Sequence, residues 1–484
     1  MSKVLQLPEG WKLKPLKSLA NISSEKHQPT GSTEYYIGLE HIHKNRGVVT
    51  EDAREEVITT VKNRFNAGDI LYGKLRPYLN KVALANRKGV CSTDILVLRP
   101  TILVEPKYLY HFLLSRQFVN DASANTAGVN LPRVSTKYIE NYLVPIPSPS
   151  IQRLIVAKIE ELFSEIDAGV QELETALKRL KVYRQVVINW AFNGRLTEDW
   201  RKHQPLLPSA EVLLKLMSSN RKQEYEKKRK KLKPLEPITA REVKGLPMLP
   251  NGWCWVRPED VCAPEDYAIG IGPFGSNLKV SDYVDSGVPL IFVKNITRNN
   301  FTLDLKFISQ SKYDELKAHS AKPLDILITK MGDPPGDCAI YPQSYPNAVI
   351  TSDCLKFRIW DSYVERRYFK YCLESDIIKS QLGLITQGVA QKKISTERFK
   401  TLCFPLASRE EQIQIVEEID SRLSEADSME LTILQSLNDA EALRQSILKQ
   451  AFEGKLINEV AKEVEETVST SRRLTGKSEQ LSLF

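Results

Sequence analysis

The chain has 484 residues, of which 42% are hydrophobic and 26% charged, and its net charge of +8 suits a polyanionic partner. This length corresponds to about three domains of ~150 residues, and no apolar run approaches the roughly 18 residues of a membrane span. Seven cysteines without a Cys-x-x-Cys pair argue against a disulfide framework or a thiolate zinc site, and they favour a cytoplasmic protein with reduced thiols.

The first 147 residues predict a globular part rich in β-sheet. A Pro-Glu-Gly-Trp motif opens this part at residues 8–11. Runs of β-branched and aromatic residues, bounded by Gly, Pro, Asn and Asp, predict strands at residues 35–39, 69–72 and 93–98. A helical stretch follows at residues 106–120, ahead of a loop at Gly128. We therefore predict an α+β fold for this part.

Residues 148–196 predict a long helix. Apolar residues recur there at steps of three and four, at Ile155, Ile159, Leu162, Ile166, Val170, Leu173, Leu177 and Leu180. Gly194 stands where a helix C-cap is expected. At ~1.5 Å per residue, the stretch from Ser150 to Trp190 spans about 60 Å. Such a helix either packs on its own globular part or pairs with a helix of equal length, and its length favours pairing.

Residues 197–248 form a predicted basic linker. Basic residues far outnumber acidic ones between Arg221 and Lys233. Such a run is more often a solvated helix face or a mobile linker than a specific phosphate contact.

Residues 249–407 repeat the organisation of the first part. A Pro-Asn-Gly-Trp motif opens this part at residues 250–253. Strands are predicted at residues 289–293, 325–328 and 352–357, followed by a helical stretch at 364–382 and a loop at Gly388. The two parts are not interchangeable, because only the second contains Pro-Phe-Gly-Ser-Asn at residues 273–277.

Residues 408–456 predict a second long helix, which repeats the first. Its apolar residues recur at Ile415, Ile419, Leu423, Ala426, Ile433, Leu437 and Ala440, with Arg422 and Glu430 interrupting the pattern. Its end, Ala-Phe-Glu-Gly at residues 451–454, matches Ala-Phe-Asn-Gly at residues 191–194. The remaining residues, 457–484, are polar and mixed in charge, which predicts a flexible tail.

These repeats predict an internal duplication with pseudo-twofold symmetry. The first helix leads away from the first globular part, so the second part begins at its far end and the second helix returns. The predicted architecture is therefore α+β, with two globular domains separated by two long antiparallel coiled-coil helices.

Two sequence motifs resemble catalytic signatures but lack the context that the chemistry needs. Residues 270–275 fit Gly-x-Gly-x-x-Gly, yet Pro273 lacks the N–H that would meet a phosphate, and no clear apolar strand precedes the motif. Residues 333–336, Asp-Pro-Pro-Gly, lack the aromatic residue that amino-methyltransferases place next, so a turn is the better interpretation. The sequence predicts no catalytic residue and no metal ligand.

The combined features resemble one protein family. Two unlike α+β regions, each introduced by Pro-x-Gly-Trp and followed by a near-identical long helix, are similar to the specificity subunit of Type I restriction–modification enzymes. The resemblance covers residues 1–456, and further similar segments are residues 68–71, 145–152 and 287–291 and the Ala-Phe-x-Gly-basic-Leu helix ends. One departure is that Pro149 and Ile151 stand where the second helix has Arg409 and Glu411.

The resemblance implies a function, partners and cofactors. Each globular part would be a target-recognition domain that reads half of a bipartite double-stranded DNA sequence. The helices would act as a ruler and hold two methyltransferase (modification) subunits, which would recruit restriction subunits. S-adenosylmethionine, Mg²⁺ and ATP would belong to those partners, and this chain would hold no cofactor.

A physical argument for DNA binding stands beside the family resemblance. A protein that reads a DNA sequence needs hydrogen-bond donors and acceptors on loops, with cations that position the phosphates. The first part offers Lys74, Arg76, Tyr78, Asn80, Lys81, Asn130 and Arg133. The second part offers Lys294, Asn295, Arg298, Lys330, Gln391, Lys392 and Lys393. Surface solubility explains any single residue equally well, but matching loops in both parts favour DNA contact.

Two further functional classes stay open beside a DNA-reading subunit. A self-contained DNA-modifying enzyme would need catalytic motifs, which the sequence does not supply. A pure protein-assembly scaffold would not need two diverged globular parts between two similar helices.

Overall fold

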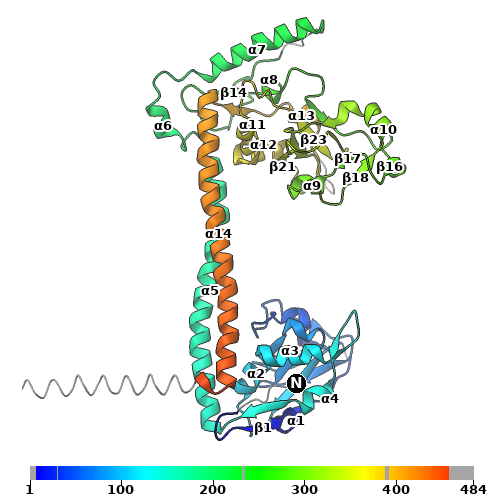
Figure 1. Ribbon diagram of the computed structural model, residues 1–484, viewed down its shortest axis with the longest axis vertical. Helices are drawn as coiled ribbons and strands as arrows, with labels where there is room; N and C mark the ends of the chain where they lie inside the picture. Colours follow the sequence, from blue (N-terminus) through cyan, green and yellow to red (C-terminus); the bar gives the residue numbers. More distant parts are fainter. Residues whose placement is uncertain (1–6, 30, 232–234, 387–391, 457–484) are drawn as a thin grey trace, which may run out of the picture. The chain divides into compact units, whose positions relative to one another are not determined.

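The computed structural model describes residues 7–29, 31–231, 235–386 and 392–456 (Figure 1). The predicted tail at 457–484 and the predicted loop at Gly388 lie outside these residues. The chain divides into two compact units, unit 1 with Met1–Thr175 and Ile433–Phe484, and unit 2 with Ala176–Thr432. The division passes through both long helices, α5 (Pro149–Phe192) and α14 (Arg409–Phe452), so each unit combines one globular part with half of each helix.

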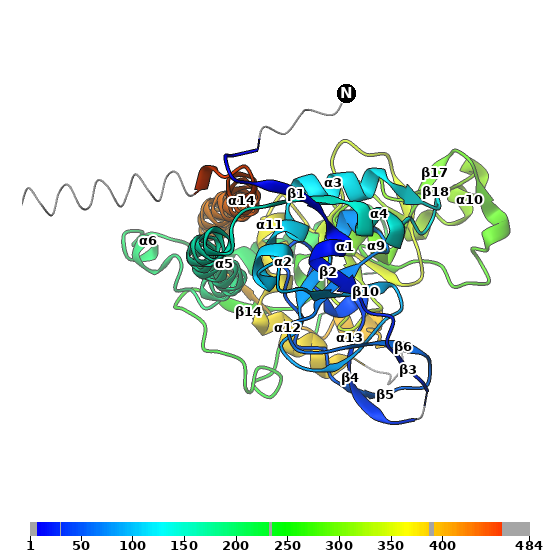
Figure 2. The same cartoon turned by 90° about the horizontal axis from the view of Figure 1, so that it is seen from below.

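Unit 1 contains antiparallel and mixed sheets covered by short helices. Its first sheet has the order β2-β10-β7-β8, and its second has the order β3-β6-β9-β4-β5, in which β4 and β9 are parallel. These strands are β2 (Ala20–Ile22), β3 (Lys26–His27), β4 (Thr33–Ile37), β5 (Glu55–Val57), β6 (Lys62–Phe65), β7 (Ile70–Gly73), β8 (Val82–Leu84), β9 (Gly89–Cys91) and β10 (Ile95–Pro100). Figure 2 shows β3, β4, β5 and β6 on the side of the unit away from α5 and α14.

The other elements of unit 1 are short. Strand β1 (Lys12–Pro15) pairs with β13 (Leu143–Ile146), and β11 (Thr126–Ala127) pairs with β12 (Arg133–Val134). The helices are α1 (Leu16–Leu19), η1 (Leu39–His41), η2 (Pro77–Leu79), α2 (Pro106–Leu114), α3 (Arg116–Ala124) and α4 (Thr136–Asn141). The predicted strands and the predicted helical stretch of this part are confirmed, with the helical stretch broken at Ser115 into α2 and α3.

Unit 2 repeats these pairings except at the edges of the second sheet, where β3 of unit 1 and β16 of unit 2 have no counterparts. Its first sheet has the order β15-β23-β20-β21, and in its second sheet, β16-β18-β17-β22-β19, the strands β17 and β22 are parallel. The strands are β14 (Cys254–Val256), β15 (Ile269–Ile271), β16 (Tyr283–Val284), β17 (Val288–Ile291), β18 (Lys306–Ile308), β19 (Ser320–Ala321), β20 (Ile326–Thr329), β21 (Cys338–Ile340), β22 (Ala348–Ile350), β23 (Cys354–Phe357) and β24 (Phe404–Leu406). As β1 pairs with β13, so β14 pairs with β24.

The helices of unit 2 surround these sheets. They are α6 (Glu198–Lys202), α7 (Ala210–Lys227), α8 (Pro258–Val261), η3 (Val280–Asp282), α9 (Val293–Thr297), α10 (Gln310–Glu315), η4 (Lys317–His319), α11 (Arg366–Glu374), α12 (Asp376–Ile385) and α13 (Thr396–Phe399). Figure 1 shows α7 and α9 on opposite sides of this unit. The predicted strands are again present, although Val293, expected in a strand, begins α9.

The core of each unit includes the ends of both long helices. In unit 1, Phe112 of α2 packs edge-on against Phe452 of α14, with ring centroids 5.1 Å apart, and Ile155 and Ile159 of α5 are fully buried beside them. In unit 2, Phe192 of α5 packs against Tyr368 of α11 at 5.0 Å. Burial of large aromatic side chains is worth several kcal/mol per ring, so these contacts hold the helix ends in place.

Ion pairs join α5 and α14 within each unit. In unit 1, Arg444 pairs with Asp167, and in unit 2 the equivalent Arg184 pairs with Asp427. Glu430, which interrupts the apolar pattern of the second helix, also accepts from Arg184 at 2.7 Å. The ion pair explains why this position tolerates a charge.

The helix ends meet the Pro-x-Gly-Trp motifs. Gly194 adopts a left-handed φ of 70°, and a Cβ at this position would lie 2.1 Å from Pro250 Cγ. Gly454 likewise leaves room for Pro8 in unit 1. In unit 2, Glu411 is fully buried and accepts from Trp253 Nε1 at 2.8 Å and from Thr197 Oγ1 at 2.8 Å. These contacts account for the pairing of a Pro-x-Gly-Trp motif with a helix-ending glycine.

The predicted basic linker contains an ordered helix. Ala210 and Met217 of α7 are fully buried in the core of unit 2. Arg221 donates from Nη2 to the carbonyl oxygen of Cys262 at 2.6 Å, and its guanidinium lies 5.2 Å from the ring centroid of Trp360. These three side chains dock α7 on unit 2, so the mobile-linker alternative is wrong for residues 221–227. The solvated-helix-face alternative is confirmed there, because Lys222 and Lys227 are exposed residues of α7.

Candidate nucleic-acid interface

In unit 1, the loops after β7 and before β12 are joined through their backbones. The N–H of Lys74 donates to Asp94 O at 2.9 Å, and the carbonyl of Lys74 accepts from Val134 at 3.1 Å. The N–H of Arg76 donates to Pro132 O at 2.7 Å. Residues 74–80 and 130–134, which are far apart in the sequence, therefore form one surface.

The side chains on this surface combine cations with exposed apolar groups. Arg76 and Asn130 are exposed, and Tyr78 is 51% exposed. Arg133 donates to both carboxylate oxygens of Asp94, at 2.9 and 3.1 Å, and this guanidinium lowers the pKa of the Asp94 carboxyl. Asp94 thus holds Arg133 in a fixed orientation beside Lys74.

One predicted DNA contact of unit 1, Asn80, is contradicted by burial, and the side chain of a second, Lys81, is bonded within the unit. Asn80 is 3% exposed and donates from Nδ2 to Leu114 O at 3.1 Å, at the end of α2. Lys81 is half-buried and donates from Nζ to Leu39 O. Both side chains anchor the loop to its neighbours through these hydrogen bonds.

Unit 2 joins the equivalent loops in the same way. The N–H of Lys330 donates to Asp353 O at 2.8 Å, and its carbonyl accepts from Ile394 at 3.0 Å. Gly332 donates to Lys392 O at 3.3 Å. Lys330, Lys392 and Lys393 are thereby brought to one surface, and Lys392 pairs with Asp333 at 2.7 Å. Gln391 lies outside the described residues.

Helix α9 lies next to this surface. Thr297 Oγ1 donates to Asp337 at 3.1 Å, which ties α9 to the loop after β20. Arg298 is exposed at the end of α9, and Lys294 pairs with Asp304 at 3.1 Å. Asn295 contradicts the prediction, because it is fully buried and caps its own segment: its Oδ1 accepts from Phe292 N–H at 2.9 Å.

Sequence reasoning missed the segment of unit 1 that corresponds to α9. His41 Nδ1 accepts from Gly38 N–H at 3.1 Å, as Asn295 does from Phe292. Asn45 then donates its N–H to Asn80 O at 3.2 Å, which places Lys44 and Asn45 beside the loop after β7. A cleft of about 390 Å³ is lined by Lys44, Asn45, Tyr78 and Arg116, among others. The match between the strands at residues 35–39 and 289–293 was the signal that could have identified this segment.

The Gly-x-Gly-x-x-Gly motif has a packing role. Only Ile269 of the short strand β15 precedes the motif, in line with the prediction, and residues 272–279 contain no helix. A Cβ at Gly272 would lie 2.2 Å from the carbonyl carbon of Thr351, so glycine is required by close backbone contact. The motif lacks the helix N-terminus that binds phosphate in nucleotide sites.

The part of the chain that the structure describes has neither a metal-binding cluster nor a candidate membrane span. No group of three or more His, Cys, Asp or Glu side chains among them is placed to hold a metal ion. Within the same residues, no helix is long and apolar enough to cross a membrane.

Comparison with known proteins shows a consistent relationship. Residues 8–177 match the family described as Type I restriction modification DNA specificity domain. The chain is 30% identical to the Type I restriction enzyme EcoDI specificity subunit of Escherichia coli over 208 residues, which are 42% of this chain and 46% of that one. It is 24% identical to the EcoKI specificity subunit of Escherichia coli (strain K12) over 74% of this chain and 68% of that one.

A solved structure shares the fold. The fold matches, with a TM-score of 0.64 and 22% identity, a chain from a structural study of complex assembly and conformational transition of the type I R-M system. The match covers 93% of this chain and 99% of that chain. Residues 8–177 thus match the DNA specificity domain of Type I restriction–modification enzymes, and the chain is similar over most of its length to a specificity subunit of such an enzyme.

Proposed function

We propose that this chain is the sequence-specific DNA-binding subunit of a Type I restriction–modification complex, in which each globular part reads one half of a bipartite target. The observation that carries the proposal is the joined loop surface that follows β7 in unit 1 and β20 in unit 2. The same backbone hydrogen bonds organise both surfaces, through Lys74 and Asp94 in one and Lys330 and Asp353 in the other. Cations on such loops can contact phosphates, and their amide and aromatic neighbours can contact base edges.

We further propose that the two units arose by duplication and are related by pseudo-twofold symmetry. Equivalent buried glutamines support this: Gln152 accepts from Glu105 N–H at 2.8 Å, and Gln412 accepts from Glu365 N–H at 2.8 Å. Equivalent ion pairs also support it, since Arg99 pairs with Asp69 at 3.0 Å and Arg358 with Asp325 at 2.7 Å. Independent folds would not share such buried polar details.

The two long helices are proposed to run antiparallel as a coiled coil, to set the spacer between half-sites and to hold two methyltransferase subunits. The ion pairs Arg444–Asp167 and Arg184–Asp427 support antiparallel pairing within each unit. The restriction subunits would join through the methyltransferase subunits. S-adenosylmethionine, Mg²⁺ and ATP would belong to these partners, and this chain would perform no catalysis and hold no cofactor. We propose a cytoplasmic location, where the DNA is.

We call the joined loop surfaces, residues 74–80 with 130–134 in unit 1 and Lys330 with Lys392 and Lys393 in unit 2, the reading surfaces. They are tested by alanine substitution in one unit at a time. Lys74→Ala with Arg76→Ala is expected to relax the sequence preference in one half of the methylated motif and leave the other half unchanged. Loss of a good bidentate base contact lowers discrimination by about 1–3 kcal/mol, whereas loss of a phosphate contact weakens all sequences alike. The measurement is the methylated motif in cells that express the chain with its methyltransferase subunit.

Lys330→Ala, at the equivalent position of unit 2, is the matched control and should affect only the other half of the motif. A pure assembly scaffold would show no dependence of the motif on either substitution. An unchanged motif and unchanged methylation in both variants would therefore contradict DNA reading by these loops.

The spacer role is tested by lengthening both helices together. Four residues inserted near Thr175 of α5 and four near Gln435 of α14 rotate each helix by about 400° and extend it by ~6 Å, so the apolar face is nearly kept. We expect the methylated motif to gain one or two base pairs between halves that are themselves unchanged, since B-DNA rises by ~3.4 Å per base pair. Inserting two residues instead rotates the face by about 200° and should impair assembly. Full activity with an unchanged spacer would show that the helices do not set the distance.

A further inference from the structure

Unit 2 has a loop at the reading surface that is shorter in unit 1. Strand β15 pairs with β23 as β2 pairs with β10, so the two strands occupy equivalent places. In unit 1, residues 23–32, which include β3, separate β2 from β4 of the parallel β4–β9 pair. In unit 2, residues 272–287 separate β15 from β17 of the equivalent parallel β17–β22 pair, and residues 272–279 of this connection precede η3. This loop contains the Pro-Phe-Gly-Ser-Asn segment that distinguishes the second part of the sequence.

Backbone contacts place this loop at the same edge of the sheet as the reading surface of unit 2. Gly272 donates its N–H to Cys354 O at 3.3 Å, and its missing side chain lets it pack on Thr351. Thr351 in turn donates its N–H to Ile291 O at 3.0 Å, two residues before α9 begins. The next residue, Ser352, accepts from Lys330 Nζ at 3.1 Å. The loop therefore leaves the sheet where α9 and the Lys330 loop also begin.

Phe274 is the prominent side chain of this loop. It is 67% exposed, and the carbonyl of Phe274 accepts from Asn277 N–H at 2.8 Å, which closes a tight turn. Single exposed apolar residues are common on protein surfaces, so exposure alone decides nothing. Phe274 differs from such residues because its loop adjoins the surface that carries Lys330, Lys392 and Arg298. A negatively charged partner bound to these cations would bury the Phe274 ring.

We infer that Phe274 makes an apolar contact with a base in the half-site that unit 2 reads. The 5-methyl group of thymine is the apolar feature that the major groove presents, and aromatic side chains can contact it. This inference rests on the proposed function, and it assigns to unit 2 a specificity-determining residue that unit 1 lacks at the equivalent place. A change at Phe274 then affects one position in one half of the target.

The test is the methylated motif in cells that express the full chain with its methyltransferase subunit. Phe274→Ala is expected to raise the methylation of sites that carry a substituted base at one position of one half-site. The increase, relative to methylation of the preferred site, should be about fourfold, because that factor corresponds to losing the burial of one methyl-sized group. Phe274→Leu, which keeps an apolar side chain, should restore most of the preference. Tyr267→Ala is the matched control, because Tyr267 is 61% exposed at the opposite end of β15.

Each outcome decides the inference. A relaxed position with Phe274→Ala, rescue by Phe274→Leu and an unchanged motif with Tyr267→Ala support it. Unchanged preference with Phe274→Ala, or an equal loss of methylation at every site, overturns it. Failure of the proposed function itself would appear differently, since the unsubstituted chain would then give no methylated motif at all. Thermal melting of the purified variants should be unchanged, because the Phe274 side chain is exposed.

Discussion

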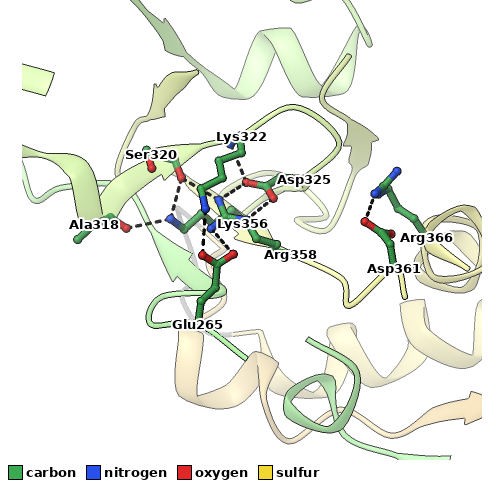
Figure 3. Close-up of polar contacts among 9 residues, drawn as sticks. All are labelled: Glu265, Ala318, Ser320, Lys322, Asp325, Lys356, Arg358, Asp361 and Arg366. Atoms are coloured by element: carbon green, nitrogen blue, oxygen red, sulfur yellow. Dashed lines mark hydrogen bonds and ion pairs between the residues drawn. The ribbon is translucent and has the colours of Figure 1, made fainter. Parts of the chain in front are cut away.

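Replacing Asp325 by Ala is expected to lower the free energy of unfolding of unit 2 by about 3–5 kcal/mol, the cost of removing one partner of a buried ion pair. Asp325 is 2% exposed and accepts from Arg358 Nε and Nη2, both at 2.7 Å (Figure 3). Without this carboxylate, the largely buried guanidinium of Arg358 keeps only Glu265, at 3.0 Å, as an ionic partner among the residues described around it.

A second buried cation increases the expected loss. Lys356 is 1% exposed in the middle of β23 and donates from Nζ to Ala318 O at 2.9 Å and to Ser320 O at 2.7 Å. Burial and the neighbouring Arg358 lower the pKa of Lys356 to about 8, even though Asp325 opposes both effects. Figure 3 shows Lys356 and Arg358 side by side, so the loss of Asp325 leaves two positive charges close together.

Asp69→Ala in unit 1 is the matched control. Asp69 makes the equivalent ion pair with Arg99, at 3.0 Å, but the Arg99 side chain is 41% exposed and can be solvated by water when Asp69 is removed. We therefore expect a smaller loss of unfolding free energy, about 1–2 kcal/mol. Most of it comes from the hydrogen bond that the backbone N–H of Asn66 donates to Asp69 at 2.8 Å. Hydrogen exchange resolved by peptide can compare β20 and β23 with β7 and β10. Equal losses in the two units would contradict this account.

Acidification from pH 7 to pH 4.5 is expected to destabilise unit 1 by about 3 kcal/mol through His111. His111 of α2 is 5% exposed, and neither ring nitrogen has a hydrogen-bond partner among the described residues. Its ring lies edge-on to Phe163 of α5, with centroids 5.7 Å apart. Burial, together with the nearby charges of Lys107 and Arg444, lowers the pKa of His111 to about 3.

The sign follows from proton binding. The unfolded chain, with a histidine pKa of about 6.5, binds a proton that the folded state excludes until about pH 3. Stability is therefore complete above pH 6.5 and is lost progressively as the pH falls towards 3. The carboxylates of Glu160, paired with Lys107, and of Asp167, paired with Arg444, engage the cations that face the ring.

Two substitutions isolate the contribution of His111. His111→Leu removes the titrating group, so the difference in unfolding free energy between the natural chain and this variant should change by about 3 kcal/mol between pH 7 and pH 4.5. His111→Tyr introduces the residue that unit 2 has at this place, where the Tyr371 hydroxyl donates to Asp420 at 2.6 Å. Urea unfolding at both pH values provides the measurement. The same pH dependence in all three proteins would show that another group is responsible.

The sequence by itself determined the elements whose residue pattern is local. Strands β7, β10, β20 and β23 follow from β-branched runs between turn residues, and helices α5 and α14 follow from apolar steps of three and four. The recurrence of a motif and a helix end was sufficient to predict two similar parts. The loops that follow β7 and β20 could also be predicted, because cations come directly after a buried strand in both parts.

Only the tertiary structure decided which side chains of those loops face outward. Asn80 and Asn295 turn inward because their amide groups satisfy the backbone at Leu114 and Leu303, which no local pattern connects to them. Met217 and Arg221 dock a helix, whereas the charged run from Arg221 to Lys233 left a solvated helix face and a mobile linker as alternatives. A strand end fixes where a loop starts, whereas the direction of each side chain depends on which distant backbone groups lack a hydrogen-bond partner, and that is settled when the sheets and helices pack together.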